Sequence, residues 1–114
     1  MIVLVENDDL ARAVTTSILV NRGMAVLSFS KAADALKAML VSPPDVLITD
    51  LMMEPMTGEK LLEEMASHPS LNNTVVIVTT ALPYPLPTLP RANLILQKPF
   101  PSEDLVQAIF KVSL

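Results

Sequence analysis

Short apolar runs alternate along the chain with longer segments of helical period. This alternation is typical of a parallel sheet whose strands are buried by helices on both faces. Five runs are predicted as strands: 2–5, 25–29, 46–49, 75–78 and 94–96. A chain of 114 residues holds one core of ordinary size, so we predict a single α/β domain over residues 1–114.

Four segments carry apolar residues at the spacing of one helix face. Gly23 is a natural stop for the first, Ser30 is the expected N-cap of the second, and the last begins after Ser102. We expect these faces to pack on the sheet. Their members are Leu10, Ala13, Val14, Ser17, Ile18, then Ala32, Ala35, Leu36, Met39, Leu40, then Gly58, Leu61, Leu62, Met65, Ala66, and finally Leu105, Val106, Ile109 and Phe110.

One crossover breaks this pattern. Residues 81–92 read ALPYPLPTLPRA, and a helix interior does not tolerate prolines at this density because each costs roughly 3 kcal/mol. We therefore predict that a proline-rich loop replaces the helix between the last two strands. Tyr84, between two prolines, is a candidate contact for a partner or a lid over the thinly covered sheet.

Composition excludes several kinds of chemistry. The chain has no Cys and one His, so thiol nucleophiles, thiolate metal sites and multi-histidine centres are ruled out. His68 lies in a turn signal and is expected on the surface. The net charge of −4 offers no basic footprint for nucleic acid or an anionic membrane. No apolar run is long enough to span a bilayer, and we expect a cytoplasmic protein.

Polar residues follow the predicted strands. Glu6 follows the first, Asp50 the third, Thr79 and Thr80 the fourth, and Lys98 comes shortly after the fifth. If the strand order is 2-1-3-4-5, Glu6 and Asp50 face each other across the crevice at the carboxyl ends of the strands. Two close carboxylates repel unless a cation lies between them, and ligands that are all oxygen favour Mg²⁺.

A flavin or nucleotide would be another use of this crevice. Such a site needs a loop rich in glycine or hydroxyl groups, whereas the loop after the first strand is Glu-Asn-Asp-Asp. Acidic side chains repel phosphate and attract metal, which disfavours nucleotide binding.

Together these segments resemble the receiver domain of two-component response regulators over nearly the whole chain. The motifs are VLVEND at 3–8, PDVLITDLMM at 44–53, MTG at 56–58, VIVTT at 76–80 and QKPF at 97–100. The resemblance implies a flavodoxin-like, doubly wound, five-stranded parallel sheet of order 2-1-3-4-5. It also implies phosphoryl transfer to Asp50 from a histidine kinase or a histidine phosphotransfer protein.

The resemblance assigns further roles by position. Glu6, Asp50 and the backbone carbonyl of Met52 would hold Mg²⁺, Thr79 would be the switch hydroxyl with Thr80 beside it, and Lys98 would contact the phosphoryl group. The Lys98–Pro99 bond matches one that is commonly cis in the family. Such a domain catalyses its own phosphorylation and dephosphorylation and is not usually counted as an enzyme.

The sequence departs from the family in the loop after Asp50, where Pro55 comes one residue late, and at three further places. Asn7 stands where a second acid is usual, which keeps an oxygen ligand but removes a charge, so we predict weaker metal binding; Asp8 could compensate by turning inward. Ile95 replaces the switch aromatic. The proline-rich crossover removes the usual fourth helix, so output through the customary dimer face is doubtful, and the sequence leaves a homodimer open.

Two functions follow from this pattern. The first is a phosphorylatable receiver that passes a conformational change to a partner. The second is a degenerate receiver that keeps the fold but acts as an interaction module without phosphate, which Asn7 and Ile95 favour. A phosphatase with an aspartyl intermediate is disfavoured, because Met52 stands where its second acid would be.

Overall fold

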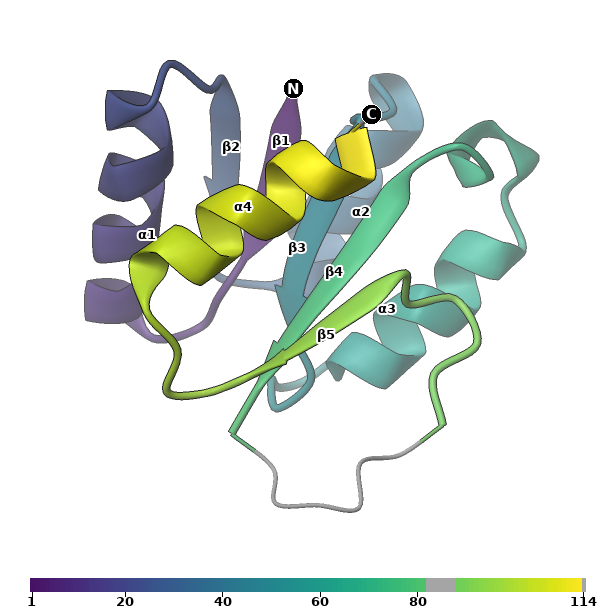
Figure 1. Ribbon diagram of the computed structural model, residues 1–114. Helices are drawn as coiled ribbons and strands as arrows, with labels where there is room; N and C mark the ends of the chain where they lie inside the picture. The colour runs from purple at the N-terminus through teal and green to yellow at the C-terminus, as the bar shows by residue number, and fades with distance from the viewer. Residues whose placement is uncertain (82–87, 114) are drawn as a thin grey trace.

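The computed structural model describes residues 1–81 and 88–113 and shows one parallel sheet (Figure 1). Its strands are β1 (Ile2–Val5), β2 (Val26–Phe29), β3 (Val46–Asp50), β4 (Val75–Thr80) and β5 (Leu94–Gln97). They lie in the order β2-β1-β3-β4-β5, and every neighbouring pair is parallel. The predicted topology is confirmed, and three strands run one or two residues further toward the site than the sequence indicated.

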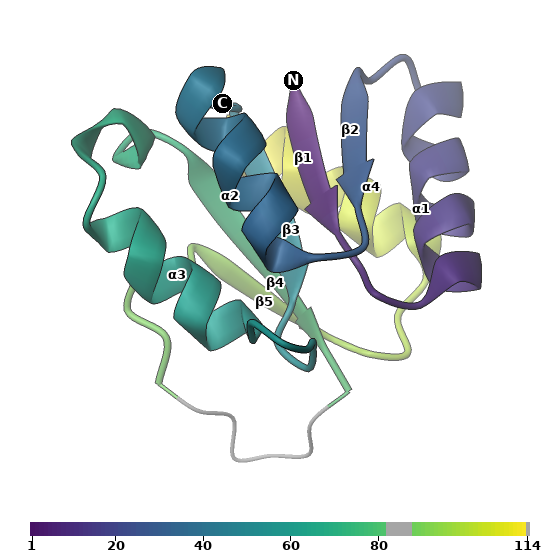
Figure 2. The same cartoon turned by 180° about the vertical axis from the view of Figure 1, so that it is seen from behind.

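Helices cover both faces of this sheet. The face toward the viewer in Figure 1 carries the C-terminal helix α4 (Ser102–Ser113), with α1 (Asp9–Asn21) beside it. Figure 2 shows the other face, which carries α2 (Ala32–Val41) and α3 (Gly58–Ala66). A short 3₁₀ helix, η1 (Pro69–Leu71), follows α3. Within the described ranges, no helix is long and apolar enough to cross a membrane.

The core divides according to the two-residue period of the strands. In β3, Leu47 packs with α2 and α3, whereas Val46 and Ile48 pack with α1 and α4. All three are at most 2% exposed. Fully burying an aliphatic side chain contributes roughly 1.5–3 kcal/mol, so the continuous apolar runs explain why the central strands form here.

Local signals explain both ends of α1 but not the start of α2. The Asp8 carboxylate accepts a hydrogen bond from the Ala11 amide at 2.7 Å and so caps α1. Gly23 has φ of 83° just after the helix, a conformation that favours glycine, so the predicted stop is confirmed. The Ser30 prediction was wrong: Lys31 is the N-cap of α2 and makes no side-chain capping bond.

All four predicted core faces were wrong in part. Leu40 of α2 is 38% exposed and Ala66 of α3 is exposed, and the larger departures are in α1 and α4. Leu10 is 74% and Val14 49% exposed, while Leu19 is the fully buried residue of α1. Apolar side chains lie on several sides of this helix, so the sequence period did not select the face that meets the sheet. Phe110 of α4 is 48% exposed, whereas Ile109 beside it is buried.

The described residues of the proline-rich crossover, 81 and 88–93, form no helix, as the sequence indicated. Tyr84 lies outside the described residues. Polar contacts fasten the returning chain: the Arg91 guanidinium donates to the Leu71 and Thr74 carbonyls at 2.8 and 2.6 Å. The Asn93 side chain accepts from the Val76 amide at 2.8 Å, directly before β5 pairs with β4.

Candidate functional site

The register of the strands brings the predicted site residues to one edge. Val5 pairs with Thr49, which places Glu6 beside Asp50, and Asp50 itself pairs with Thr79. Thr80 pairs with Gln97, so Lys98 follows at the end of β5. Side chains along a strand alternate between the two faces of the sheet. By this alternation, the face that carries α1 and α4 also carries all four site residues: Glu6, Asp50, Thr79 and Lys98.

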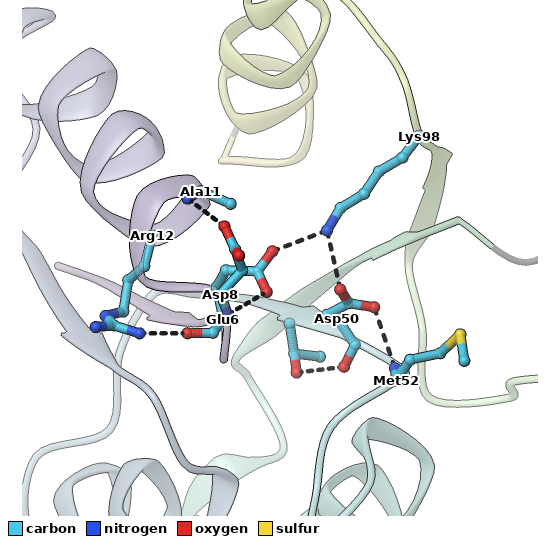
Figure 3. Close-up of polar contacts among 8 residues, drawn as sticks. Glu6, Asp8, Ala11, Arg12, Asp50, Met52 and Lys98 are labelled. Carbon is cyan, nitrogen blue, oxygen red and sulfur yellow. Dashed lines mark hydrogen bonds and ion pairs between the residues drawn. The ribbon is translucent and has the colours of Figure 1, made fainter.

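Lys98 joins the two carboxylates. Its Nζ donates to Glu6 Oε1 at 2.8 Å and to Asp50 Oδ2 at 2.9 Å (Figure 3). Glu6 is 6% and Asp50 8% exposed, so the ammonium replaces much of the water that would otherwise solvate them. Burial lowers the pKa of Lys98, but the hydrogen bonds and charges of Glu6 and Asp50 outweigh it and raise that pKa above its ordinary value.

Main-chain amides hold the other carboxylate oxygens. The Asp8 amide donates to Glu6 Oε2 at 3.2 Å, and the Met52 amide donates to Asp50 Oδ1 at 3.1 Å (Figure 3). The Lys98 amide donates to the Thr80 carbonyl at 2.7 Å, which ties the end of β5 to β4. The site is thus oriented by backbone groups as well as by its ion pairs.

The N-terminus of α3 packs tightly against the back of Asp50. The Gly58 amide donates to the Leu51 carbonyl at 3.0 Å. A Cβ added at Gly58 would lie 2.1 Å from the Asp50 carbonyl oxygen and 2.8 Å from Leu51 Cα. Only glycine fits this approach, so Gly58 places the candidate acceptor as well as beginning the helix. In the sequence, Gly58 is a member of the predicted helix face and of the MTG motif, neither of which predicts this close contact.

The other predicted residues differ in how they lie relative to Glu6 and Asp50. Thr79 lines a hollow of about 140 Å³ together with Glu6 and Lys98. Thr80 is fully buried, and its side chain is on the opposite face of the sheet from Thr79. Its carbonyl contributes to the site by accepting the hydrogen bond from the Lys98 amide. Ile95 is partly buried against the α2 and α3 side of the core. Asn7 is exposed.

Asn7 borders a second hollow, of about 450 Å³, whose other lining residues follow Asp50 in the chain. Met52 and Glu54 also line it. Met52 is 59% exposed, whereas Met53 is buried in the core. Asn7, Met52 and Glu54 therefore meet solvent around one hollow.

Asp8 does not supply the acid that Asn7 lacks. Its carboxylate caps α1, as described above, and its amide holds Glu6. The idea that Asp8 turns inward was wrong in this structure, because capping uses the side chain. An acid immediately before a helical segment is a capping signal, and that signal could have revealed the role.

The donor set fits a hard cation held by few charges. All candidate ligands are oxygens: the Glu6 and Asp50 carboxylates, the Asn7 amide and the Met52 carbonyl. Each carboxylate oxygen of Glu6 and Asp50 accepts one hydrogen bond and keeps a second lone pair. However, no group of three or more His, Cys, Asp or Glu that could hold a metal occurs within residues 1–81 and 88–113.

The comparisons with known proteins agree with this geometry. The model of the response regulator receiver domain matches residues 2–110, so the chain belongs to the response regulator receiver domain family. This is the family whose motifs the sequence resembles. No curated protein matches the chain significantly.

Solved receiver domains share the fold at low sequence identity. One from a signal transduction histidine kinase of Syntrophus aciditrophicus has a TM-score of 0.90 and 23% identity, covering 98% of this chain and 88% of that chain. The receiver domain of the Francisella response regulator 1452 has a TM-score of 0.89 and 19% identity, covering 98% and 94%. A putative response regulator from Chloroflexus aurantiacus has a TM-score of 0.89 and 22% identity, covering 98% and 95%.

Proposed function

We propose that this receiver domain accepts a phosphoryl group on Asp50 from a histidine kinase or a histidine phosphotransfer protein in the cytoplasm. The observation that carries the proposal is the buried pair of carboxylates bridged by Lys98 at the carboxyl edge of the sheet. A structural ion pair needs no second buried acid, whereas phosphoryl transfer needs a nucleophile, an oxygen-rich cation site and a positive charge together.

In the proposed reaction, an Asp50 carboxylate oxygen attacks the phosphorus of a phosphohistidine. The new O–P bond forms as the N–P bond breaks, and the electron pair of the N–P bond returns to the imidazole nitrogen. Lys98 already lies 2.9 Å from Asp50 Oδ2 and would stay beside the phosphoryl oxygens. Thr79 borders the same hollow and would donate its hydroxyl to one of them. Hydrolysis of the acyl phosphate would return the domain to its resting state, so it is not an enzyme acting on a separate substrate.

Mg²⁺ bound by Glu6, Asp50, Asn7 and the Met52 carbonyl would neutralise the phosphoryl charge. Asn7 contributes no charge, and Lys98 cancels one of the two buried negative charges. We therefore expect weak Mg²⁺ binding in which the ion keeps several waters.

Phosphorylation is tested with Mg²⁺ and acetyl phosphate, followed by intact mass measurement. We expect one added phosphoryl group in the parent protein and none in Asp50→Asn, which keeps the size of the side chain and removes the nucleophilic carboxylate. Asp45→Asn is the matched control, because Asp45 is exposed and precedes the same strand. An adduct that persists in Asp50→Asn would refute Asp50 as the acceptor.

The exposed apolar residues at the start of α1 suit the phosphodonor protein. Leu10 and Val14 lie one turn apart and follow directly on the loop that carries Glu6. A donor histidine must approach Asp50 from this edge, so its carrier would cover this surface. Replacing both residues with Ala should slow transfer from a phosphorylated protein donor about 10-fold, since truncated interface anchors often cost 1–2 kcal/mol.

The acetyl phosphate reaction of the Leu10→Ala, Val14→Ala variant should remain unchanged, because a small donor needs no docking surface. Val20→Ala provides a control on the same helix, being 52% exposed and at the far end from Glu6. Equal slowing with both donors would show that the substitutions disturb the site instead of a docking surface.

The degenerate receiver remains the second candidate function. Asn7 and the missing switch aromatic at Ile95 favour it. A folded protein that takes up no phosphoryl group from acetyl phosphate or from a protein donor, at saturating Mg²⁺, would select this candidate.

A further inference from the structure

Arg12 makes a hydrogen bond to the main chain outside its own helix, α1. It lies in the first turn of α1, and its side chain is 22% exposed. One guanidinium nitrogen donates to Asp9 Oδ1 at 2.7 Å, an ordinary ion pair within the helix. The other reaches back out of the helix and donates to the Glu6 carbonyl at 2.9 Å (Figure 3).

This bond restrains the main chain at the beginning of the acidic loop. The Glu6 carbonyl belongs to the peptide that joins Glu6 to Asn7, so fixing it limits rotation of that peptide. On its side-chain end, Glu6 is held by Lys98 and by the Asp8 amide. Glu6 is therefore clamped at both ends, and Arg12 supplies the main-chain half of the clamp.

We infer that Arg12 is a positioning residue for the proposed cation site: by fixing the Glu6–Asn7 peptide it limits where the Glu6 carboxylate and the Asn7 amide can lie relative to Asp50. The inference rests on the proposed function, because it concerns the Mg²⁺ that the proposal requires. Two effects of Arg12 oppose each other. Its positive charge repels a cation and so weakens Mg²⁺ binding, whereas its hydrogen bond orients the ligands and so strengthens it. Whether the Mg²⁺ affinity falls or rises when Arg12 is replaced therefore shows which effect is larger.

The test is a titration of Arg12→Gln with Mg²⁺, in which the shifts of the backbone amide NMR resonances give the Kd. The titration is done at a temperature where every variant is folded. Outer groups that orient metal ligands typically contribute 10–100-fold to affinity, so we expect the Kd for Mg²⁺ to rise about 10-fold. Arg12→Lys keeps the charge and one donor and should recover part of the affinity. An unchanged or lower Kd in Arg12→Gln would overturn the inference, since loss of charge alone tightens binding.

Arg22→Gln is the matched control. Arg22 follows the same helix and pairs with Glu103 at 2.8 Å, on the surface. We expect no change in its Kd for Mg²⁺. A Kd raised equally by both substitutions would also overturn the inference, because a general loss of helix stability would then account for the effect.

A measurement without metal separates this inference from the proposed function. The Asp8 amide donates to Glu6 Oε2, so its hydrogen exchange reports how firmly Glu6 is held. We expect exchange at Asp8 to accelerate at least several-fold in Arg12→Gln and to stay unchanged in Arg22→Gln. Unchanged exchange in both refutes the positioning role. A parent protein that binds no Mg²⁺ refutes the metal-dependent function instead, and the exchange result then decides the role of Arg12 alone.

Discussion

Replacing Gly58 with Ala should destabilise the domain by about 3 kcal/mol, at the upper end of what overpacking usually costs. The added Cβ would lie 2.1 Å from the Asp50 carbonyl oxygen, and the nearest atoms are backbone, which cannot move as a flexible side chain would. The helix must therefore shift away from the end of β3. Alanine's better helix propensity offsets at most about 1 kcal/mol of this cost.

We expect a lower free energy of unfolding in urea for Gly58→Ala. If Asp50 is the proposed acceptor, its displacement should also lower the rate of phosphorylation by acetyl phosphate. Gly23→Ala is the control: its φ of 83° strains any other residue, but nothing lies within 4 Å of the added Cβ. We expect Gly23→Ala to lose about 1 kcal/mol and to keep its phosphorylation rate. Equal stability of Gly58→Ala and the parent would contradict the close approach of α3.

Replacing Lys98 with Met should also cost about 3 kcal/mol near neutral pH. The substitution keeps the length of the side chain and leaves Glu6 and Asp50 buried without their counter-charge, and breaking a buried pair from one side typically costs 3–5 kcal/mol. We take the lower figure because the Lys98 side chain is 30% exposed. Mg²⁺ at the proposed site should restore part of the loss, because it would neutralise the same two carboxylates.

The pH dependence of this difference has a definite sign. The pKa of Lys98 is raised in the folded protein above its ordinary value of 10.5. Its contribution is therefore fully present below about pH 10 and is lost as the pH rises through the folded pKa. The difference in unfolding free energy between the parent and Lys98→Met should stay constant from pH 7 to about pH 10 and shrink above it.

Lys60→Met is the matched control for Lys98. Lys60 Nζ lies 3.6 Å from Glu63 Oε2 and 3.4 Å from Glu64 Oε1, and the Lys60 side chain is 54% exposed. Surface pairs of this kind contribute at most about 1 kcal/mol. A loss no greater in Lys98→Met than in Lys60→Met would show that the bridge at the site is not a buried interaction.

The apolar runs were sufficient to predict the strands, and their order of appearance predicted the parallel sheet. Buried parallel strands require continuous runs such as Ile2–Val5, and crossovers require a helix or a long loop between them. Proline density predicted that the chain before β5 is not helical, which holds for residues 81 and 88–93, the part of this crossover that the structure describes. Proline removes a helix hydrogen bond whatever its surroundings. These are local properties, and the sequence carries them directly.

The face of α1 and the burial of Phe110 were not predictable in the same way. The helix between β1 and β2 has apolar residues on several sides, so its period fits more than one orientation. Contact with the sheet and with α4 buried Leu19 and left Leu10 and Val14 exposed. That choice depends on neighbours far away in the sequence.

For this receiver domain, the sequence by itself indicated the strands and the polar residues at their ends, Glu6, Asp50, Thr79 and Lys98, and its resemblance to the family implied the sheet order. Only the tertiary structure decided that Lys98 bridges Glu6 and Asp50, that Asp8 caps α1, that Arg12 holds the Glu6 carbonyl and that Gly58 lies against Asp50. The physical reason is that local period and propensity act within an element. Hydrogen-bond partners and close approaches arise only when elements distant in the chain are packed together.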